Sequence, residues 1–143
     1  MRIFHAIGAA VGATLFLVAV PSGALAEPSD MITVDPTGYI ASNGTVTLSG
    51  TYRCSDDASP AVVYVGSHLE QDGNEAGIGG TVAECDGNEH RWSNHDQPFR
   101  AAFKPGSAKV QGTLLTFSLD FGIPLPRFLS VEDQRITLAP AGQ

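Results

Sequence analysis

The chain has 143 residues, and its 8 Lys and Arg against 15 Asp and Glu give a formal net charge of −7 at pH 7. This length allows one domain and leaves no room for a doubly wound sheet or for a TIM barrel, which needs about 200 residues or more. The acidic balance disfavours nucleic-acid binding, because such proteins concentrate Lys and Arg against phosphates. Beyond the N-terminal segment there is no run of about 18 apolar residues, so we expect no membrane span there.

Residues 1–26 have the pattern of a secretory signal peptide. Arg2 supplies a positive charge, residues 7–20 are apolar or small, and Ala24-Leu25-Ala26 is a small-x-small cleavage site. An uncleaved membrane anchor is the alternative. We therefore expect cleavage after Ala26, which would leave residues 27–143 as a single secreted, extracellular domain with no membrane contact.

The first half of this domain predicts β-strands separated by turns. A short edge strand is expected at residues 32–34. Residues 45–54 alternate apolar and polar side chains with a period of two, which is typical of a half-buried strand. Asn43-Gly44 precedes this strand and, after residues 38–41, indicates a hairpin turn, because both residue types tolerate positive φ. Residues 61–71 begin apolar on both faces and predict a central strand.

The second half continues the same pattern. Further strands are expected at residues 79–85, around 90–92, at 108–119 and at 131–138, with Asp-Gly turns at 72–73 and 86–87. The apolar phase changes within 108–119, and we interpret this change as a β-bulge near Gly112. No segment shows helical spacing over more than two turns. We therefore predict an all-β fold, an antiparallel β-sandwich of about seven strands.

The segment 121–128 is unusually apolar for a connection between strands. Its large side chains surround two prolines: Phe121, Ile123, Pro124, Leu125, Pro126 and Phe128. Because each proline lacks an N–H group and fixes φ, the segment is predicted to be a stiff, extended loop and not a central strand. The four large side chains either fold back to cap one end of the core or form a partner contact, with Ile123 and Leu125 in solvent.

Cys54 and Cys85 are the only two cysteines, so one disulfide connectivity is possible. We predict a structural disulfide that links two strand ends, since the chain is expected to be exported. Free thiols or a redox pair are the alternatives, although redox pairs normally have the spacing C-x-x-C. A loop of this length is expected to stabilise the fold by roughly 3–4 kcal/mol.

Three runs resemble an uncharacterised family of small secreted proteins from high-GC Gram-positive bacteria. They are Gly44–Cys54, Cys85–Trp92 and Phe103–Val110. The resemblance covers most of the domain and implies an immunoglobulin-like sandwich. It implies no activity and no site residues. Trp92 follows the second cysteine, whereas antibody domains place the tryptophan between the two, so the strand topology is left open.

Two patterns could hold a metal ion. His90, His95 and Asp96 form H-x4-H-D, but His90 and His95 have opposite parity on a strand and should face apart. Asp-Gly-Asn-Glu occurs at 72–75 and again at 86–89, with oxygen ligands that suit calcium. The two copies should cap opposite ends of the strand between them, so we interpret both as turns and predict no metal and no cofactor.

Catalytic and sugar-binding patterns are weak. The sequence contains no G-x-S-x-G motif, and its carboxylates are scattered. Tyr39, Tyr64 and Trp92 could stack on sugars if they shared an exposed face, but we interpret Trp92 as a core residue. We therefore predict a secreted, non-enzymatic domain that binds an extracellular protein or a cell-surface ligand. An inhibitor of an extracellular hydrolase is the alternative, and a small secreted enzyme such as a hydrolase is the second.

Overall fold

The computed structural model describes residues 29–56, 62–99, 102–120 and 122–142, and these residues form eight β-strands. The predicted all-β fold is confirmed, with one strand more than expected. The strands are β1 (Met31–Ile32), β2 (Thr37–Ile40), β3 (Val46–Arg53), β4 (Val63–Gln71), β5 (Asn74–Val82), β6 (His90–Asp96), β7 (Gly106–Asp120) and β8 (Ile123–Pro140). The signal peptide predicted at residues 1–26 lies outside the described residues.

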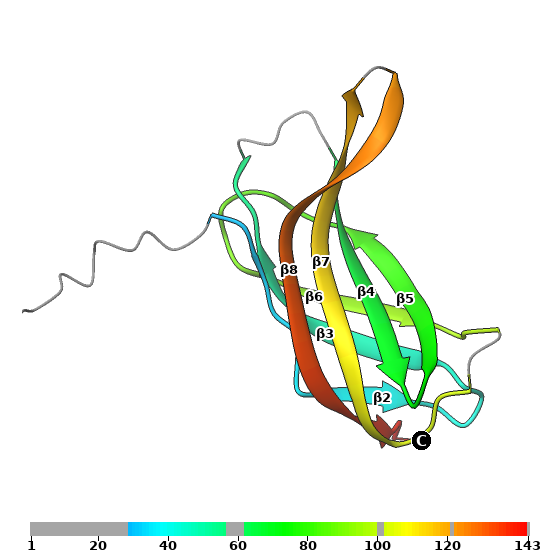
Figure 1. The fold of residues 1–143 in the computed structure, drawn as a ribbon. Helices are drawn as coiled ribbons and strands as arrows, with labels where there is room; N and C mark the ends of the chain where they lie inside the picture. The colour runs from blue at the N-terminus through cyan, green and yellow to red at the C-terminus, as the bar shows by residue number, and fades with distance from the viewer. Residues whose placement is uncertain (1–28, 57–61, 100–101, 121, 143) are drawn as a thin grey trace, which may run out of the picture.

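The strands form two layers that cross each other, as Figure 1 shows. One layer has the order β8-β7-β4-β5, and in the other layer β3 pairs with β1, β2 and β6. β2 joins the layers by pairing in parallel with β8, while the other strand pairs of the described residues are antiparallel, as the predicted antiparallel sandwich requires. An immunoglobulin-like sandwich has strands B and E in one layer and strands C, F and G in the other. Here β3 and β6 take the places of B and E, and β4, β7 and β8 take those of C, F and G.

The core lies between the two layers. Every second residue of β3 is buried. Every second residue of β4 and of β7 is buried as well, on the side that faces the other layer. The largest fully buried apolar side chains are Ile32, Leu48, Leu69, Ile78, Leu114 and Leu138. The period of two in the sequence therefore reports burial between layers, as predicted for half-buried strands.

The two predicted hairpin turns form in different ways. Asp72 and Gly73 both have positive φ, 49° and 83°, in a two-residue connection between β4 and β5, which is the type I′ geometry. In the turn before β3, positive φ is found at Gly44, at 89°. There the Asn43 side chain instead accepts a hydrogen bond from the Thr45 backbone N–H at 2.9 Å.

The disulfide between Cys54 and Cys85 is present, with a Cα–Cα distance of 4.6 Å. Cys54 follows directly after β3, as expected, but the prediction that Cys85 ends a strand is wrong. β5 ends at Val82, because the chain must then cross from one layer to the other before β6 begins. The disulfide and a bond from the Gly87 N–H to the Cys54 carbonyl, 2.9 Å, hold this crossover segment against the end of β3.

The bulge predicted near Gly112 lies two residues further along β7. Gly112 pairs regularly with β8 and stays on the buried face of β7, together with Val110 and Leu114. The register shift lies between Leu114 and Leu115, and it leaves Leu129 of β8 without a direct partner. The apolar phase changes along β7 because the outer face also becomes apolar, and not because the strand slips.

The prediction of a loop at 121–128 is also wrong. Residues from Ile123 onward begin β8 and pair with β7, while Phe121 lies outside the described residues. Pro124 and Pro126 have the same parity, so both can turn their nitrogen toward the edge of β8 that has no neighbouring strand there. Pairing between β4 and β7 begins at Val63 and Thr116, so residues 117–120 and 123–126 form a two-stranded ribbon that projects from one end of the sandwich (Figure 1). We call this ribbon the projecting hairpin.

Candidate partner-binding surface

The projecting hairpin has exposed apolar side chains on both of its faces. Directly paired residues of antiparallel strands point to the same side, so Leu119 and Pro124 share one face with the pair Phe117 and Pro126. Ile123 and Leu125 belong to the other face, where Leu125 pairs with Ser118. Leu119 is 74% exposed, and Ile123 and Leu125 are 61% and 47% exposed.

The predicted core cap is therefore not formed by these side chains. Phe128 is also exposed, and the neighbouring residue that packs on the core is Leu129, which is partly buried. The hairpin extends beyond the end of the β4–β7 pairing, so these parts of β7 and β8 lie past the packed layers (Figure 1). The alternative in which Ile123 and Leu125 face solvent is the one that the structure shows.

A larger apolar surface lies on the outside of the β8-β7-β4-β5 layer. Tyr64 pairs with Val82 on one side and Leu115 on the other, and Leu115 pairs with Phe128, so these side chains form one row across four strands. Tyr64 also contacts the Phe117 ring edge-on, with 6.1 Å between the ring centroids. We call this surface the apolar outer face; its members are Val62, Tyr64, Val82, Leu115, Phe117, Leu119, Pro124, Pro126, Phe128 and Val131.

The other half of the same outer surface is polar. A shallow depression of about 240 Å³ is lined by His68, Glu70, Glu75, Lys109, Gln111 and Asp133. All six residues are exposed. Water therefore screens their charges, whereas catalytic groups depend on sites from which water is excluded.

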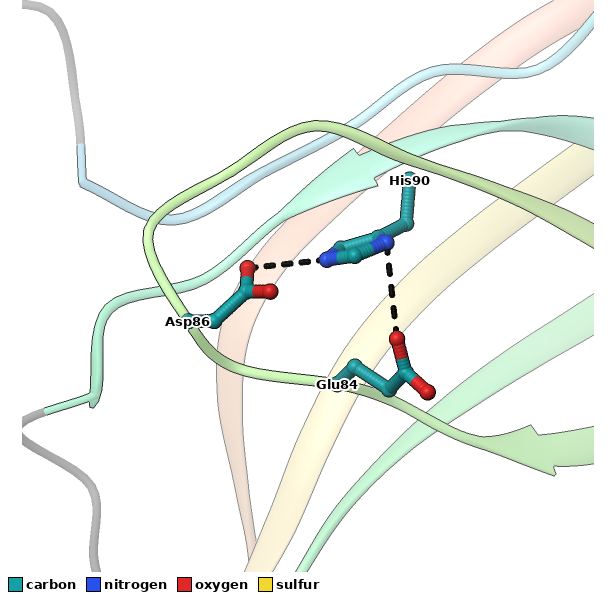
Figure 2. A group of neighbouring side chains, drawn as sticks. All are labelled: Glu84, Asp86 and His90. Carbon is teal, nitrogen blue, oxygen red and sulfur yellow. Dashed lines mark hydrogen bonds and ion pairs between the residues drawn. The ribbon is translucent and has the colours of Figure 1, made fainter.

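His90 lies between the carboxylates of Glu84 and Asp86, as Figure 2 shows, and these two residues flank Cys85 in the sequence. Its Nε2 donates to Asp86 Oδ1 at 2.8 Å, and its Nδ1 lies 3.6 Å from Glu84 Oε2. The ring also stacks on Tyr52 with 5.5 Å between centroids. Hydrogen bonds from His90 and from the Asn88 backbone N–H lower the pKa of Asp86.

These three side chains are close enough to be considered as metal ligands. However, the two carboxylates address opposite nitrogens of the same imidazole, Asp86 at Nε2 and Glu84 at Nδ1. One ring nitrogen and one oxygen of each carboxylate lie within 4.8 Å of one another, so the group offers three ligands, whereas structural zinc sites have four. His90, at the start of β6, therefore holds the crossover segment in place through its contacts with Asp86 and Glu84.

The sequence patterns considered for metals are separated in space. His90 lies on the half-buried side of β6, while His95 and Asp96 are exposed further along the same strand. The first Asp-Gly-Asn-Glu copy forms the turn before β5, and the second lies in the crossover segment after it. The two copies thus occupy opposite ends of β5, as predicted from the sequence.

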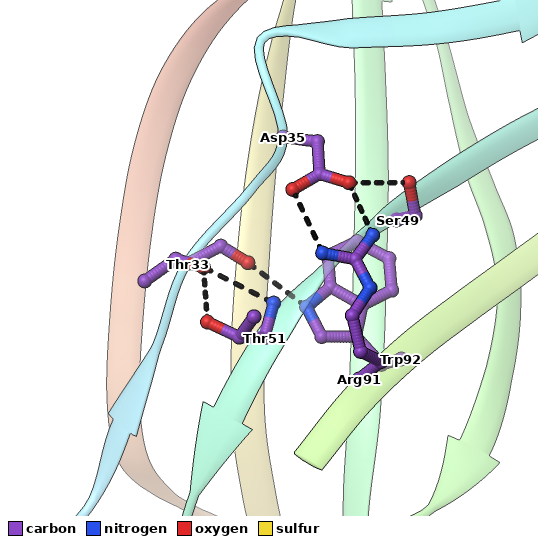
Figure 3. Close-up of polar contacts among 6 residues, drawn as sticks. All are labelled: Thr33, Asp35, Ser49, Thr51, Arg91 and Trp92. Atoms are coloured by element: carbon purple, nitrogen blue, oxygen red, sulfur yellow. Dashed lines mark hydrogen bonds and ion pairs between the residues drawn. The ribbon is translucent and has the colours of Figure 1, made fainter. Parts of the chain in front are cut away.

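Trp92 is buried, and the aromatic residues considered for sugar binding do not form one platform. Its Nε1–H donates to the Thr33 carbonyl at 2.9 Å, as Figure 3 shows. Tyr39 is exposed on β2, and Tyr64 is exposed on β4 in the other layer. Trp92 thus has the core role that the sequence analysis assigned to it.

A charged clamp beside Trp92 was missed by the sequence analysis. Arg91 contacts both carboxylate oxygens of Asp35, with 3.3 Å between Nη1 and Oδ1, and the Ser49 hydroxyl donates to Oδ2 at 2.9 Å (Figure 3). The hydrogen bond from Arg91 lowers the pKa of Asp35 against the opposing effect of burial. Asp35 and Arg91 are 56 residues apart, so no local pattern indicates their pairing.

The described residues contain no helix long and apolar enough to cross a membrane. Comparison with curated proteins finds no match. Among solved structures, one of murine CRIg covers 79% of this chain and 98% of its own, with 11% sequence identity and a TM-score of 0.33. The model of a family of unknown function, DUF6299, matches residues 28–141. The chain therefore belongs to the DUF6299 family.

Proposed function

We propose that the protein is a secreted, non-enzymatic binding domain, released as residues 27–143 after signal cleavage, and that the projecting hairpin contacts an extracellular protein partner. The observation that carries this proposal is the exposure of Ile123 and Leu125 on one face of the hairpin. We call these two residues the contact pair. Large apolar side chains held in solvent on a projecting element are typical of interaction sites.

The backbone of the hairpin supports this role. Pro124 and Pro126 fix φ on either side of Leu125, and β7 pairs with this part of β8 up to the turn. A stiff element loses little conformational entropy on docking, so more of the contact free energy remains as affinity. The prolines also remove N–H donors from the free edge of β8, which disfavours strand addition there and favours contact through side chains.

A catalytic role has weaker support. The polar depression is the arrangement that would favour an enzyme, since it brings His68 near Glu70 and Asp133. These side chains are exposed, and the electrostatic contribution of exposed groups to catalysis is reduced by water. The partner class is therefore proposed from the hairpin and not from this depression.

The test is a capture experiment with tagged residues 27–143 and culture supernatant of the producing cells. Replacement of the contact pair, Ile123→Ser with Leu125→Ser, should reduce recovery of the specific partner at least tenfold, because about 1.4 kcal/mol of lost contact corresponds to that factor. The melting temperature should change by only a few degrees, since both residues are exposed.

The matched control replaces Tyr39 and Phe99 with Ser, because both are exposed apolar residues that lie outside the projecting hairpin. This control should retain partner capture. Loss of capture in the control but not in the contact-pair variant would contradict the proposal. A large fall in melting temperature for the contact-pair variant would show that the two residues stabilise the fold instead.

Inhibition of an extracellular hydrolase is a second candidate, favoured by the same projection of the hairpin. A stiff, extended ribbon is the kind of element that enters an active-site cleft. In that case the activity of a captured hydrolase would fall when the wild-type protein is added. Addition of the contact-pair variant would leave that activity unchanged. A captured hydrolase that stays fully active in the complex would contradict this candidate.

A further inference from the structure

We propose that the apolar outer face binds the same face of a second copy of this chain, which gives a symmetric, face-to-face dimer. This surface is distinct from the contact pair, because Phe117 and Leu119 point to the opposite side of the projecting hairpin from Ile123 and Leu125. The proposal therefore stands or fails independently of the proposed partner contact.

The area of the apolar outer face matches what a dimer needs. The exposed fractions of Val62, Tyr64, Val82, Phe117, Leu119, Phe128 and Val131 equal nearly four complete side chains. At about 150–250 Å² for an aromatic side chain, and less for Val and Leu, this corresponds to roughly 600–700 Å². The largest apolar patch on an ordinary monomer is about 300–600 Å², whereas a standard interface buries about 800 Å² on each partner.

The distribution of charge favours a second copy over a charged partner. The chain has a net charge of −7, yet no member of the apolar outer face carries a charge. On the outer surface of this layer, Glu70, Lys109 and Asp133 lie on the other half, and Arg127, which pairs with Thr116, belongs to the opposite side of β8. Two acidic molecules can therefore meet through their neutral halves while the charged halves stay in water.

The geometry favours contact between faces and not between edges. A row of side chains that crosses four strands forms a broad surface, and two such surfaces can pack as the layers of a sandwich do, about 10 Å apart. Pro124 and Pro126 weaken the edge of β8 as a site for strand addition. A face-to-face contact is also isologous, so it closes after two copies and does not propagate into fibres.

The experiment measures the mass of purified residues 27–143 by sedimentation equilibrium over a range of concentrations. Interfaces of this area have dissociation constants from micromolar to picomolar, so the protein should be largely dimeric at about 100 µM. The variant Phe117→Glu with Leu119→Glu should be monomeric, with a dissociation constant at least 100-fold higher, because each interface would bury four uncompensated charges. The contact-pair variant is the matched control on the other face of the hairpin and should remain dimeric.

A charge-swap experiment separates a dimer interface from a folding defect. A second variant, Phe117→Lys with Leu119→Lys, should also be monomeric alone. Mixing it with the glutamate variant should restore a dimer, because opposite charges would then meet across the interface. A wild-type protein that stays monomeric at about 100 µM, or variants that still dimerise alone, would overturn the proposal. A further outcome is that the wild type is monomeric and captures an unrelated protein, while the glutamate variant does not. The apolar outer face would then bind that partner, and the dimer would be refuted.

Discussion

Substitution of Gly50 by Ala tests how tightly the segment between β1 and β2, which contains Thr33, packs across β3. A Cβ atom at position 50 would lie 2.0 Å from the Thr33 carbonyl oxygen and 2.7 Å from Trp92 Nε1. The first contact is with backbone, so it cannot be relieved by a side-chain rotation. Residue 33 would have to move away from β3, and the hydrogen bond from Trp92 to its carbonyl would be lost.

The expected cost follows from these contacts. Overpacking in a close-packed region costs about 1–3 kcal/mol. Loss of the Trp92 hydrogen bond adds about 1 kcal/mol. Replacing Gly by Ala restricts the unfolded chain and returns about 0.4–1 kcal/mol. The free energy of unfolding should therefore fall by roughly 1–4 kcal/mol, which corresponds to a melting temperature lower by at least about 4 °C at roughly 4–8 °C per kcal/mol.

Thermal and urea unfolding of both proteins measure this change, and Gly77→Ala is the matched control. Gly77 also lies in a strand, but a Cβ atom there would meet nothing within 4 Å. The control should unfold within about 0.5 kcal/mol of the wild type. Equal stability of the Gly50→Ala and Gly77→Ala proteins would refute the close approach between residue 33 and β3.

Three further predictions concern stability. Replacing Cys54 and Cys85 with Ala should lower the melting temperature by more than about ten degrees, because a disulfide with a sequence separation of 31 contributes roughly 3–4 kcal/mol; alkylation of both native cysteines without reductant would contradict the bond. The lowered pKa of Asp35 means that its pairing with Arg91 stabilises the fold above pH about 4 and loses this effect as the pH falls through the folded pKa. Asp35→Asn should therefore reduce the acid sensitivity of unfolding below pH about 4, and an unchanged pH profile would exclude this role. Trp92→Phe should cost about 1–3 kcal/mol in urea unfolding, because it leaves the carbonyl partner of the indole without its donor, and a neutral result would show that this bond is not needed.

The sequence alone determined those features that depend on local pattern. Alternation with a period of two identified the residues of β3 as a half-buried strand, because a strand places successive side chains on opposite faces. Asp72-Gly73 located a tight turn, because positive φ is needed at both positions. Two cysteines allow one pairing, so the disulfide needed no knowledge of the fold.

The tertiary structure decided which apolar residues are covered. The sequence shows that Leu125 is apolar, but its exposure depends on where the opposite layer ends, and strands distant in sequence set that limit. The same is true of the clamp between Asp35 and Arg91. These two residues meet because β6 pairs with β3 and the segment between β1 and β2 runs alongside β3. The candidate site consists of apolar side chains that remain uncovered after the layers have packed, and a linear pattern records polarity but not burial.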